Sequence, residues 1–128
     1  MNKSKKGYTF EETSHKAIGA AIEVHKNLGP GFEEVIYQRA LARELFRLGL
    51  DFSREVWMPV YYKNEKIGTK RVDFFVEEIL IEIKAKSEFD PQDYMQTISY
   101  LKASKYNTGL LINFGAKKVE VKRLVNNN

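Results

Sequence analysis

Apolar side chains recur along this chain with two different periods. Three segments return an apolar residue every three to four positions, which predicts amphipathic helices: 9–29, 31–49 and 90–105. Five segments alternate apolar and polar residues or form short apolar runs, which predicts strands: 51–62, 67–76, 79–86, 107–114 and 118–125. The expected order of elements is therefore α-α-β-β-β-α-β-β.

The ends of the predicted helices carry recognisable signals. Thr9 and Glu12 have the spacing of a capping box, and Gly29 is a typical helix stop. Asp90 is a good N-cap residue and is followed by Pro91, which suits the first helical position. The inner faces are expected to contain Phe32, Val35, Ile36, Leu41, Leu45 and Leu48 in the second helix, and Tyr94, Met95, Ile98 and Leu101 in the third.

The spacing of the elements predicts a mixed sheet. The first three strands follow one another closely enough to form an antiparallel meander, with Pro59 placing the first strand at an edge or a bulge. The third helix then crosses over to the strand at 107–114. The fold class is therefore α/β in the broad sense, an α+β mixed sheet with helices packed on it. At 128 residues the chain is expected to be one domain, residues 1–128, with frayed ends at about 1–8 and 126–128.

The hairpin at residues 71–86 combines core and charged positions. A turn at Glu77 and Glu78 places Asp73 opposite Glu82. The same register places Val72 opposite Ile83 and Arg71 opposite Lys84. Side chains alternate between the faces of a strand. One face should therefore be core throughout, with Val72 on it, and the other should grade from apolar into Asp73, Glu82, Arg71 and Lys84.

Two facing carboxylates need an explanation, because like charges directly opposite each other destabilise a sheet. They must share a proton, find cationic partners or bind a metal ion. A hard divalent cation with oxygen ligands would satisfy both acids. Lys84, on the same face, could then position a water or stabilise charge on a phosphate. The alternative is a salt-bridge ladder in which Arg71 and Lys84 neutralise Asp73 and Glu82.

The chain contains its own control for this motif. Glu120 and Lys122 repeat the Glu-x-Lys spacing of Glu82 and Lys84 on another predicted strand. No acid precedes the second copy on a neighbouring strand. The spacing alone is therefore weak evidence, and Asp73 is what distinguishes the first copy.

Other residues add to the candidate site. Glu34 stands near the start of the second helix, where the helix dipole favours a carboxylate, so ordinary helix capping is an alternative reading. Gln96 and Tyr100 are four residues apart and share a face of the third helix. Gln96 could orient a water or a phosphate, or could be a solvated surface residue.

Composition narrows the function classes. Cysteine is absent, which excludes disulfides and thiolate metal sites and fits a cytoplasmic location. No apolar run approaches the roughly 20 residues that span a bilayer, so no membrane partner is expected. The net charge of +4 mildly favours a polyanionic partner. Lys117, Lys118, Lys122 and Arg123 could follow a phosphate backbone or could simply be a solvated edge.

Together these residues resemble the PD-(D/E)XK nuclease superfamily. Asp73, a spacer, and Glu82-Ile83-Lys84 match its signature, although Val72 stands where the signature has proline. Within that superfamily the chain is similar to the small GxxExxY proteins, whose motif matches residues 31–37, from Gly31 through Glu34 to Tyr37. The resemblance extends over roughly residues 10–125. It implies a nuclease-like αβββαβ core with an added N-terminal helix and C-terminal strand.

The resemblance also implies roles for individual residues. Asp73, Glu82, the Ile83 carbonyl and Glu34 would hold Mg²⁺ or Mn²⁺. Lys84 would be the catalytic lysine, with Asp73, Glu82 and Gln96 also in the catalytic set, and Arg71, Tyr37 and Tyr100 would support the site or contact substrate. The expected function is divalent-metal-dependent hydrolysis of nucleic-acid phosphodiester bonds, with DNA favoured over RNA, in a monomer or a homodimer. The alternative is a catalytically inactive nuclease-fold module that binds nucleic acid or a protein partner.

Overall fold

The computed structural model describes residues 7–126. Within this range three helices and five strands follow the predicted order. The helices are α1 (Phe10–Leu28), α2 (Glu34–Arg47) and α3 (Pro91–Ala103). The strands are β1 (Phe52–Tyr62), β2 (Glu65–Val76), β3 (Ile79–Lys84), β4 (Thr108–Asn113) and β5 (Glu120–Val125). Among the described helices, none is both long and apolar enough to cross a bilayer.

The predicted mixed sheet is confirmed. Its strands lie in the order β1-β2-β3-β4-β5, with β1, β2 and β3 forming the antiparallel meander. The α3 crossover places β4 parallel to β3, and β5 returns antiparallel to β4. Pro59 lies in the edge strand β1, where a missing backbone N–H is tolerated.

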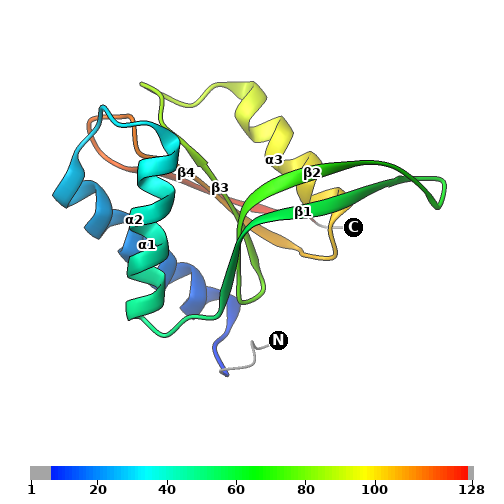
Figure 1. Ribbon diagram of the computed structural model, residues 1–128, viewed down its shortest axis with the longest axis horizontal. Helices are drawn as coiled ribbons and strands as arrows, with labels where there is room; N and C mark the ends of the chain where they lie inside the picture. Colours follow the sequence, from blue (N-terminus) through cyan, green and yellow to red (C-terminus); the bar gives the residue numbers. More distant parts are fainter. Residues whose placement is uncertain (1–6, 127–128) are drawn as a thin grey trace.

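Helices cover both faces of the sheet (Figure 1). α1 and α2 pack on one face over a large core that includes Leu41, Leu45, Phe74 and Ile81. A smaller core on the α3 side contains Met58, Val72, Leu80 and Leu101. β1 and β2 run beyond this body as a two-stranded arm (Figure 1).

The helix ends follow the sequence signals. The Thr9 hydroxyl accepts from the Glu12 N–H at 3.1 Å, and the Glu12 carboxylate accepts from the Thr9 N–H at 3.1 Å, so the predicted capping box is formed. Asp90 caps α3, and Pro91 opens it. The predicted frayed ends, 1–8 and 126–128, lie largely outside the described residues. Tyr8, which is described, packs partly buried against the larger core.

The predicted inner faces of α2 and α3 need correction. In α2, Phe32, Val35 and Leu48 are exposed. Phe32 precedes the helix, which begins at Glu34, Leu48 is its C-cap, and Tyr37 takes the buried position in the first turns. In α3, Met95 is exposed, and the buried stripe runs through Asp93, Thr97 and Leu101 at four-residue intervals. The buried face of α3 therefore begins with a carboxylate.

Candidate functional site

Asp73 lies where β2 separates from β3. The predicted register holds for Val76 with Ile79, Phe75 with Leu80, and Phe74 with Ile81, and the ladder ends there. The predicted pairs of Asp73 with Glu82, Val72 with Ile83 and Arg71 with Lys84 are therefore not part of the ladder.

The strand is irregular on its other side as well. β1 pairs on both sides of Glu55, which has φ +53° and faces Asp73 without a ladder pair. Beyond this point Val72 packs with Met58, Leu80 and Leu101 on the α3 side, not with Phe74 as the alternation predicted. Asp73 thus occupies a local distortion of β2.

The Asp73 carboxylate fills the gap that this distortion opens. Its Oδ2 accepts from the Ile83 N–H at 2.8 Å, taking the place of a ladder bond. Its Oδ1 accepts from the Gln38 side-chain amide of α2 at 3.2 Å. Gln38 is itself buried. Asp73 is thereby fixed against β3 and α2 together.

Glu82 is a carboxylate in the middle of the sheet. It sits on β3 between β2 and β4, with only 7% of its surface exposed. Its Oε1 has no hydrogen-bond partner among the described residues. Burial raises the pKa of Glu82 to about 9, and the negative charge of Asp73 adds to this shift. At neutral pH the pair therefore carries a proton unless a cation takes its place.

Two lysines follow Glu82 along the chain: Lys84 is the last residue of β3, and Lys86 lies just beyond it. The Lys84 Nζ lies 4.0 Å from Oδ1 of Asp93, which is buried in the first turn of α3. The Lys86 Nζ donates to Asp90 Oδ2 at 2.8 Å and to Asp93 Oδ2 at 3.0 Å. These hydrogen bonds, the one to Asp90 first, raise the pKa of Lys86, and Lys86 in turn lowers the pKa of Asp90.

Asp93 was missed as a site residue by sequence reasoning. The signal was available, because Asp-Pro-Gln-Asp has the spacing of a reciprocal cap between Asp90 and Asp93. The structure contains that cap, with the Asp90 N–H donating to Asp93 Oδ2 at 2.9 Å. What the spacing did not reveal is that both lysines converge on this carboxylate.

The end of β3 is clamped by the end of β4. Asn113 is fully buried and pairs with Lys84 across the parallel strands. Its Oδ1 accepts from the Lys86 N–H at 2.9 Å, and its Nδ2 donates to the Lys86 carbonyl at 2.8 Å. Gly115 lies so close that an added Cβ would stand 2.3 Å from the Lys86 nitrogen. The clamp fixes the backbone that carries both lysines.

Glu34 lies in the first turn of α2, near the charged groups of the site. Partial burial at the site raises its pKa, as do the charges of Asp73 and Asp93, whereas Lys84 and Lys86 oppose the shift. These interactions place Glu34 among the same charged groups.

Tyr37 supports the loop before this turn. It is fully buried, donates to the Gly29 carbonyl at 2.5 Å and accepts from the Phe32 N–H at 3.2 Å. Tyr37 was expected to support the site or to contact substrate. Because its side chain is fully buried, this placement fits the supporting role.

The remaining predicted residues are Arg71 on β2 and Gln96 and Tyr100 on α3. Arg71 is exposed and pairs with Glu55 at 3.4 Å, so it does not lie beside Lys84 as expected. Gln96 is half-buried one turn after Asp93, and Tyr100 one turn further. The Lys70 Nζ lies 4.9 Å from the Tyr100 ring centre. Gln96 and Tyr100 thus follow Asp93 on successive turns of α3.

The carboxylates of the site determine whether a metal ion can bind there. Within residues 7–126, no group of three or more His, Cys, Asp or Glu side chains is close enough to hold one. Asp73 and Glu82 nevertheless form an adjacent pair, and Glu82 keeps a buried, unpartnered oxygen. Two carboxylates with a free oxygen suit a hard cation that fills its remaining positions with water or substrate. The pair fits such an ion.

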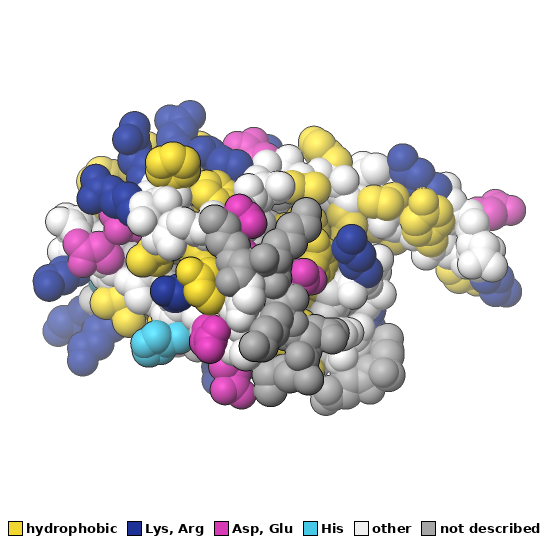
Figure 2. All heavy atoms as spheres, turned by 90° about the horizontal axis from the view of Figure 1, so that it is seen from below, with side chains coloured by type: hydrophobic (Ala, Val, Ile, Leu, Met, Phe, Trp, Pro, Cys, Tyr) yellow, Lys and Arg dark blue, Asp and Glu magenta, His cyan; other side chains and the backbone are white. Residues whose placement is uncertain are grey.

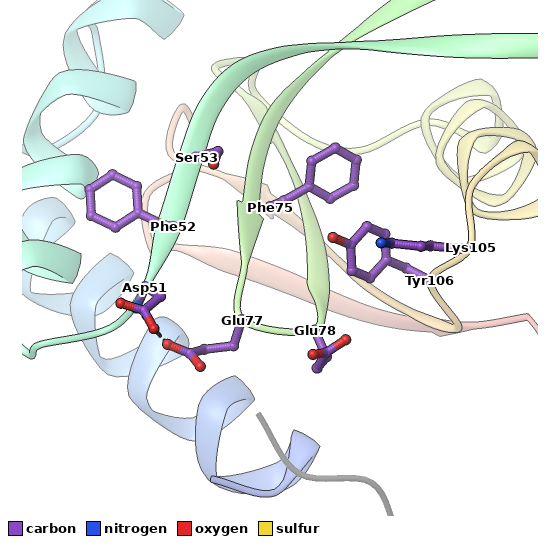
Figure 3. Close-up of a pocket in the computed structure, with 8 residues that line it drawn as sticks. All are labelled: Asp51, Phe52, Ser53, Phe75, Glu77, Glu78, Lys105 and Tyr106. Carbon is purple, nitrogen blue, oxygen red and sulfur yellow. Dashed lines mark hydrogen bonds between the residues drawn. The ribbon is translucent and has the colours of Figure 1, made fainter. Parts of the chain in front are cut away.

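A separate cavity contains acids that do not belong to this site. It has a volume of about 350 Å³ and lies at the β2–β3 turn, at the other end of the hairpin from Asp73 and Lys84. Figure 3 shows Asp51 and Glu77 side by side there, joined by the hydrogen bond from the Asp51 N–H to the Glu77 carboxylate. Figure 3 also shows Phe75 next to Tyr106, and their rings stack with centroids 4.6 Å apart. The Asp51 bond stabilises the turn, where Glu77 has φ +53°.

Comparison with known proteins gives one extensive match. The family model described as the PD-(D/E)XK nuclease superfamily matches residues 11–124. No curated protein matches the chain. Among solved structures, the chain is similar to "Crystal structure of SSO0001" with a TM-score of 0.48 and 15% identity, over 82% of this chain. The match spans 60% of that structure's chain.

Proposed function

The chain belongs to the PD-(D/E)XK nuclease superfamily, and from this premise we propose that it is a divalent-metal-dependent nuclease that hydrolyses nucleic-acid phosphodiester bonds. The observation that carries the proposal is the buried Glu82 carboxylate, which has an unpartnered oxygen beside Asp73 and a lysine two residues later. Burying a carboxylate without a partner for one of its oxygens is energetically unfavourable, and such groups are typical of sites that a ligand completes.

Each side chain has a role in this proposal. Asp73, Glu82, the Ile83 carbonyl and Glu34 would hold Mg²⁺ or Mn²⁺. When bound, the ion would activate water and neutralise charge on the phosphate. Because Glu82 holds a proton at neutral pH, ion binding would release that proton.

Lys84 would act on the reacting phosphate. Its ammonium would stabilise the negative charge that develops on the phosphate oxygens, and Asp93 would hold it in place. Gln96, one turn along α3 from Asp93, would orient the attacking water or the phosphate. DNA is the favoured substrate over RNA, and a homodimer remains a prediction.

The test is a cleavage panel of labelled DNA and RNA, single- and double-stranded, with Mg²⁺, Mn²⁺ or EDTA. We expect cleavage with metal, none in EDTA, and none by Lys84→Ala. The matched control is Lys122→Ala, which removes the lysine of the other Glu-x-Lys copy and should cut as wild type does. Metal-independent cutting, or equal cutting by the Lys84→Ala variant, would reject the assignment.

One observation favours the second candidate, an interaction module. Trp57, Tyr61 and Tyr62 on the β1–β2 arm are 65%, 59% and 59% exposed, and exposed aromatic clusters commonly mark binding surfaces. A module of this kind would bind nucleic acid or a protein without cutting. Retention of labelled substrates in both Mg²⁺ and EDTA, with no product in the cleavage panel, would support this candidate.

A further inference from the structure

A row of arginines lies on the exposed face of α2. Arg39, Arg43 and Arg47 are spaced by four residues, so they share one face of the helix. All three are exposed, and none forms an ion pair with another residue in the range 7–126. Like charges at this spacing weakly destabilise a helix. Arg47, in the last turn, is favoured by the helix dipole, but Arg39 and Arg43 are not, so helix stability does not explain the row as a whole.

The arginines line a cavity together with Arg54 of β1. The cavity has a volume of about 480 Å³ and is lined by Arg39, Ala42, Arg43, Phe46, Arg47 and Arg54. Four guanidinium groups around one hollow, with no carboxylate in its lining, make an anion-binding surface. In Figure 2 basic side chains gather at the end of the molecule opposite the β1–β2 arm, with others along the arm.

A hydrogen-bond chain connects this cavity to the candidate site. The Arg54 Nη2 donates to Gln38 Oε1 at 3.1 Å, and the Gln38 Nε2 donates to Asp73 Oδ1 at 3.2 Å. Arg39 also follows Glu34 by five residues on α2, about 7 Å along the helix axis. The cavity is thus adjacent to the carboxylates of the site.

We propose that this arginine cavity binds the phosphate backbone of the nucleic-acid strand that enters the site. The inference rests on the proposed function and adds a substrate-positioning surface to it. Arg39 and Arg47 are eight residues apart, about 12 Å along the helix. One strand of a duplex carries a phosphate about every 3.4 Å of the duplex axis, so a duplex lying parallel to α2 would place three to four phosphates of that strand along this length. Guanidinium groups bind phosphate oxygens through paired hydrogen bonds.

A second basic cavity provides a matched control. It is lined by Ile22, His25, Lys26, Lys117, Lys118 and Val119, and its three lysines equal the three α2 arginines in charge. Within the described residues, no hydrogen bond connects those lysines to Asp73 or Glu82. If binding depended on net charge alone, removing the three lysines would weaken binding as much as removing the three α2 arginines.

The experiment measures nucleic-acid binding without catalysis. Fluorescence anisotropy of a labelled 20-nucleotide strand and its duplex is recorded in EDTA over a range of salt concentrations. Each phosphate contact contributes about 0.7 to the slope of log affinity against log salt for single strands and about 0.9 for duplex. The combined Arg39→Gln, Arg43→Gln and Arg47→Gln variant should therefore lower the slope by about two to three. The Lys26→Gln, Lys117→Gln, Lys118→Gln variant should keep the wild-type slope.

A conservative variant separates charge from fold. Changing the same arginines to lysine keeps the charge and should restore most of the slope. In the cleavage assay, the glutamine variant should raise KM more than it lowers kcat, because the arginines hold the strand and do not act at the reacting phosphate.

The outcomes distinguish this inference from the proposed function. If wild type cleaves but the arginine variant keeps its slope and KM, the cavity assignment is wrong and the nuclease assignment stands. If the slope falls as expected but wild type cuts nothing, the cavity assignment stands and the nuclease assignment fails. Equal losses from the arginine and lysine variants, or no binding by wild type, would overturn the cavity assignment.

Discussion

Two copies of Glu-x-Lys lie in the same sheet, on β3 and β5, separated by β4. Glu82 is buried, with one unpartnered oxygen and a pKa raised to about 9 by burial and by Asp73. Glu120 is half-buried, and its carboxylate accepts from the Asn113 Nδ2 at 2.8 Å. The same spacing thus produces a buried carboxylate with an unpartnered oxygen in β3 and a half-buried, hydrogen-bonded carboxylate in β5.

The lysines differ in the same way. Lys84 lies 4.0 Å from the buried Asp93 carboxylate, while Lys122 is exposed near the Tyr94 ring. β3 is central and covered on both faces, whereas β5 is an edge strand. The comparison teaches that the position of the strand in the sheet, and not the Glu-x-Lys tripeptide itself, determines how buried the two side chains are and what they contact.

The largest expected effect is on cleavage. Glu82→Gln removes a proposed metal ligand and should lower kcat/KM by about 1,000-fold or more, since preorganised electrostatic groups contribute on this scale. Glu120→Gln should stay within about twofold of wild type, because the Glu120 carboxylate bonds to Asn113 and, within residues 7–126, to neither Asp73 nor Lys84. Single-turnover rates with Mg²⁺ measure both. Similar rates for the two variants would remove the distinction between the copies.

The next effect is on the pH dependence of stability without metal. The folded-state pKa of Glu82, about 9, lies above its unfolded value of 4.5, so folding favours the protonated form. The stabilisation is complete below pH 4.5 and is lost as the pH rises through about 9. Between pH 5 and pH 9 the free energy of unfolding should fall by a few kcal/mol from this group.

Urea denaturation in EDTA at several pH values checks this trend. Glu82→Gln cannot ionise and should flatten it, with the greatest gain over wild type near pH 9. Glu120→Gln should retain the wild-type trend. A flat profile for wild type would show that Glu82 is not held protonated by its surroundings.

A smaller effect concerns the clamp at the end of β3. Gly115→Ala places a methyl group against the backbone of Lys86 and should lower the free energy of unfolding by about 2 kcal/mol, as overpacking usually does. Gly19→Ala in α1 meets no atom within 4 Å and should raise it by up to about 1 kcal/mol. Urea titrations compare them. Equal stability of the two variants would contradict the close approach at Gly115.

The smallest effect is expected at Asp93. Asp93→Asn keeps an acceptor for the Asp90 N–H but removes the negative charge near Lys84 and Lys86. We expect kcat to fall about tenfold through misplacement of Lys84. Asp90→Asn, which changes an exposed carboxylate bonded to Lys86 but not to Lys84, should stay near wild type. The kcat values from steady-state cleavage decide whether Asp93 acts through Lys84.

Much of the fold could be predicted because local signals agree with it. The capping residues Thr9 and Asp90, the alternation of the strands and the two-residue turn at Glu77 each specify structure over a few residues. The register of the hairpin followed from the turn as far as Phe74. These features depend on neighbours in sequence, which a single sequence reveals.

The distortion at Asp73 could not be predicted in the same way. It depends on the irregularity at Glu55 in β1 and on Gln38 in α2, which supplies a partner for the carboxylate. The convergence of Lys84 and Lys86 on Asp93 depends on how α3 packs over the sheet. These contacts join segments distant in the chain. The sequence therefore indicated which residues were unusual but not which contacts they make with one another.

The most direct test of the account is titration calorimetry with Mn²⁺ on wild type, Glu82→Gln and Glu120→Gln. Repeating it in buffers of different ionisation enthalpy measures the protons released on binding. We predict that wild type and Glu120→Gln bind Mn²⁺ with proton release near neutral pH, and that Glu82→Gln does not bind. No binding by wild type at millimolar Mn²⁺, or equal binding by Glu82→Gln, would contradict the claim that the Asp73 and Glu82 pair is a metal site.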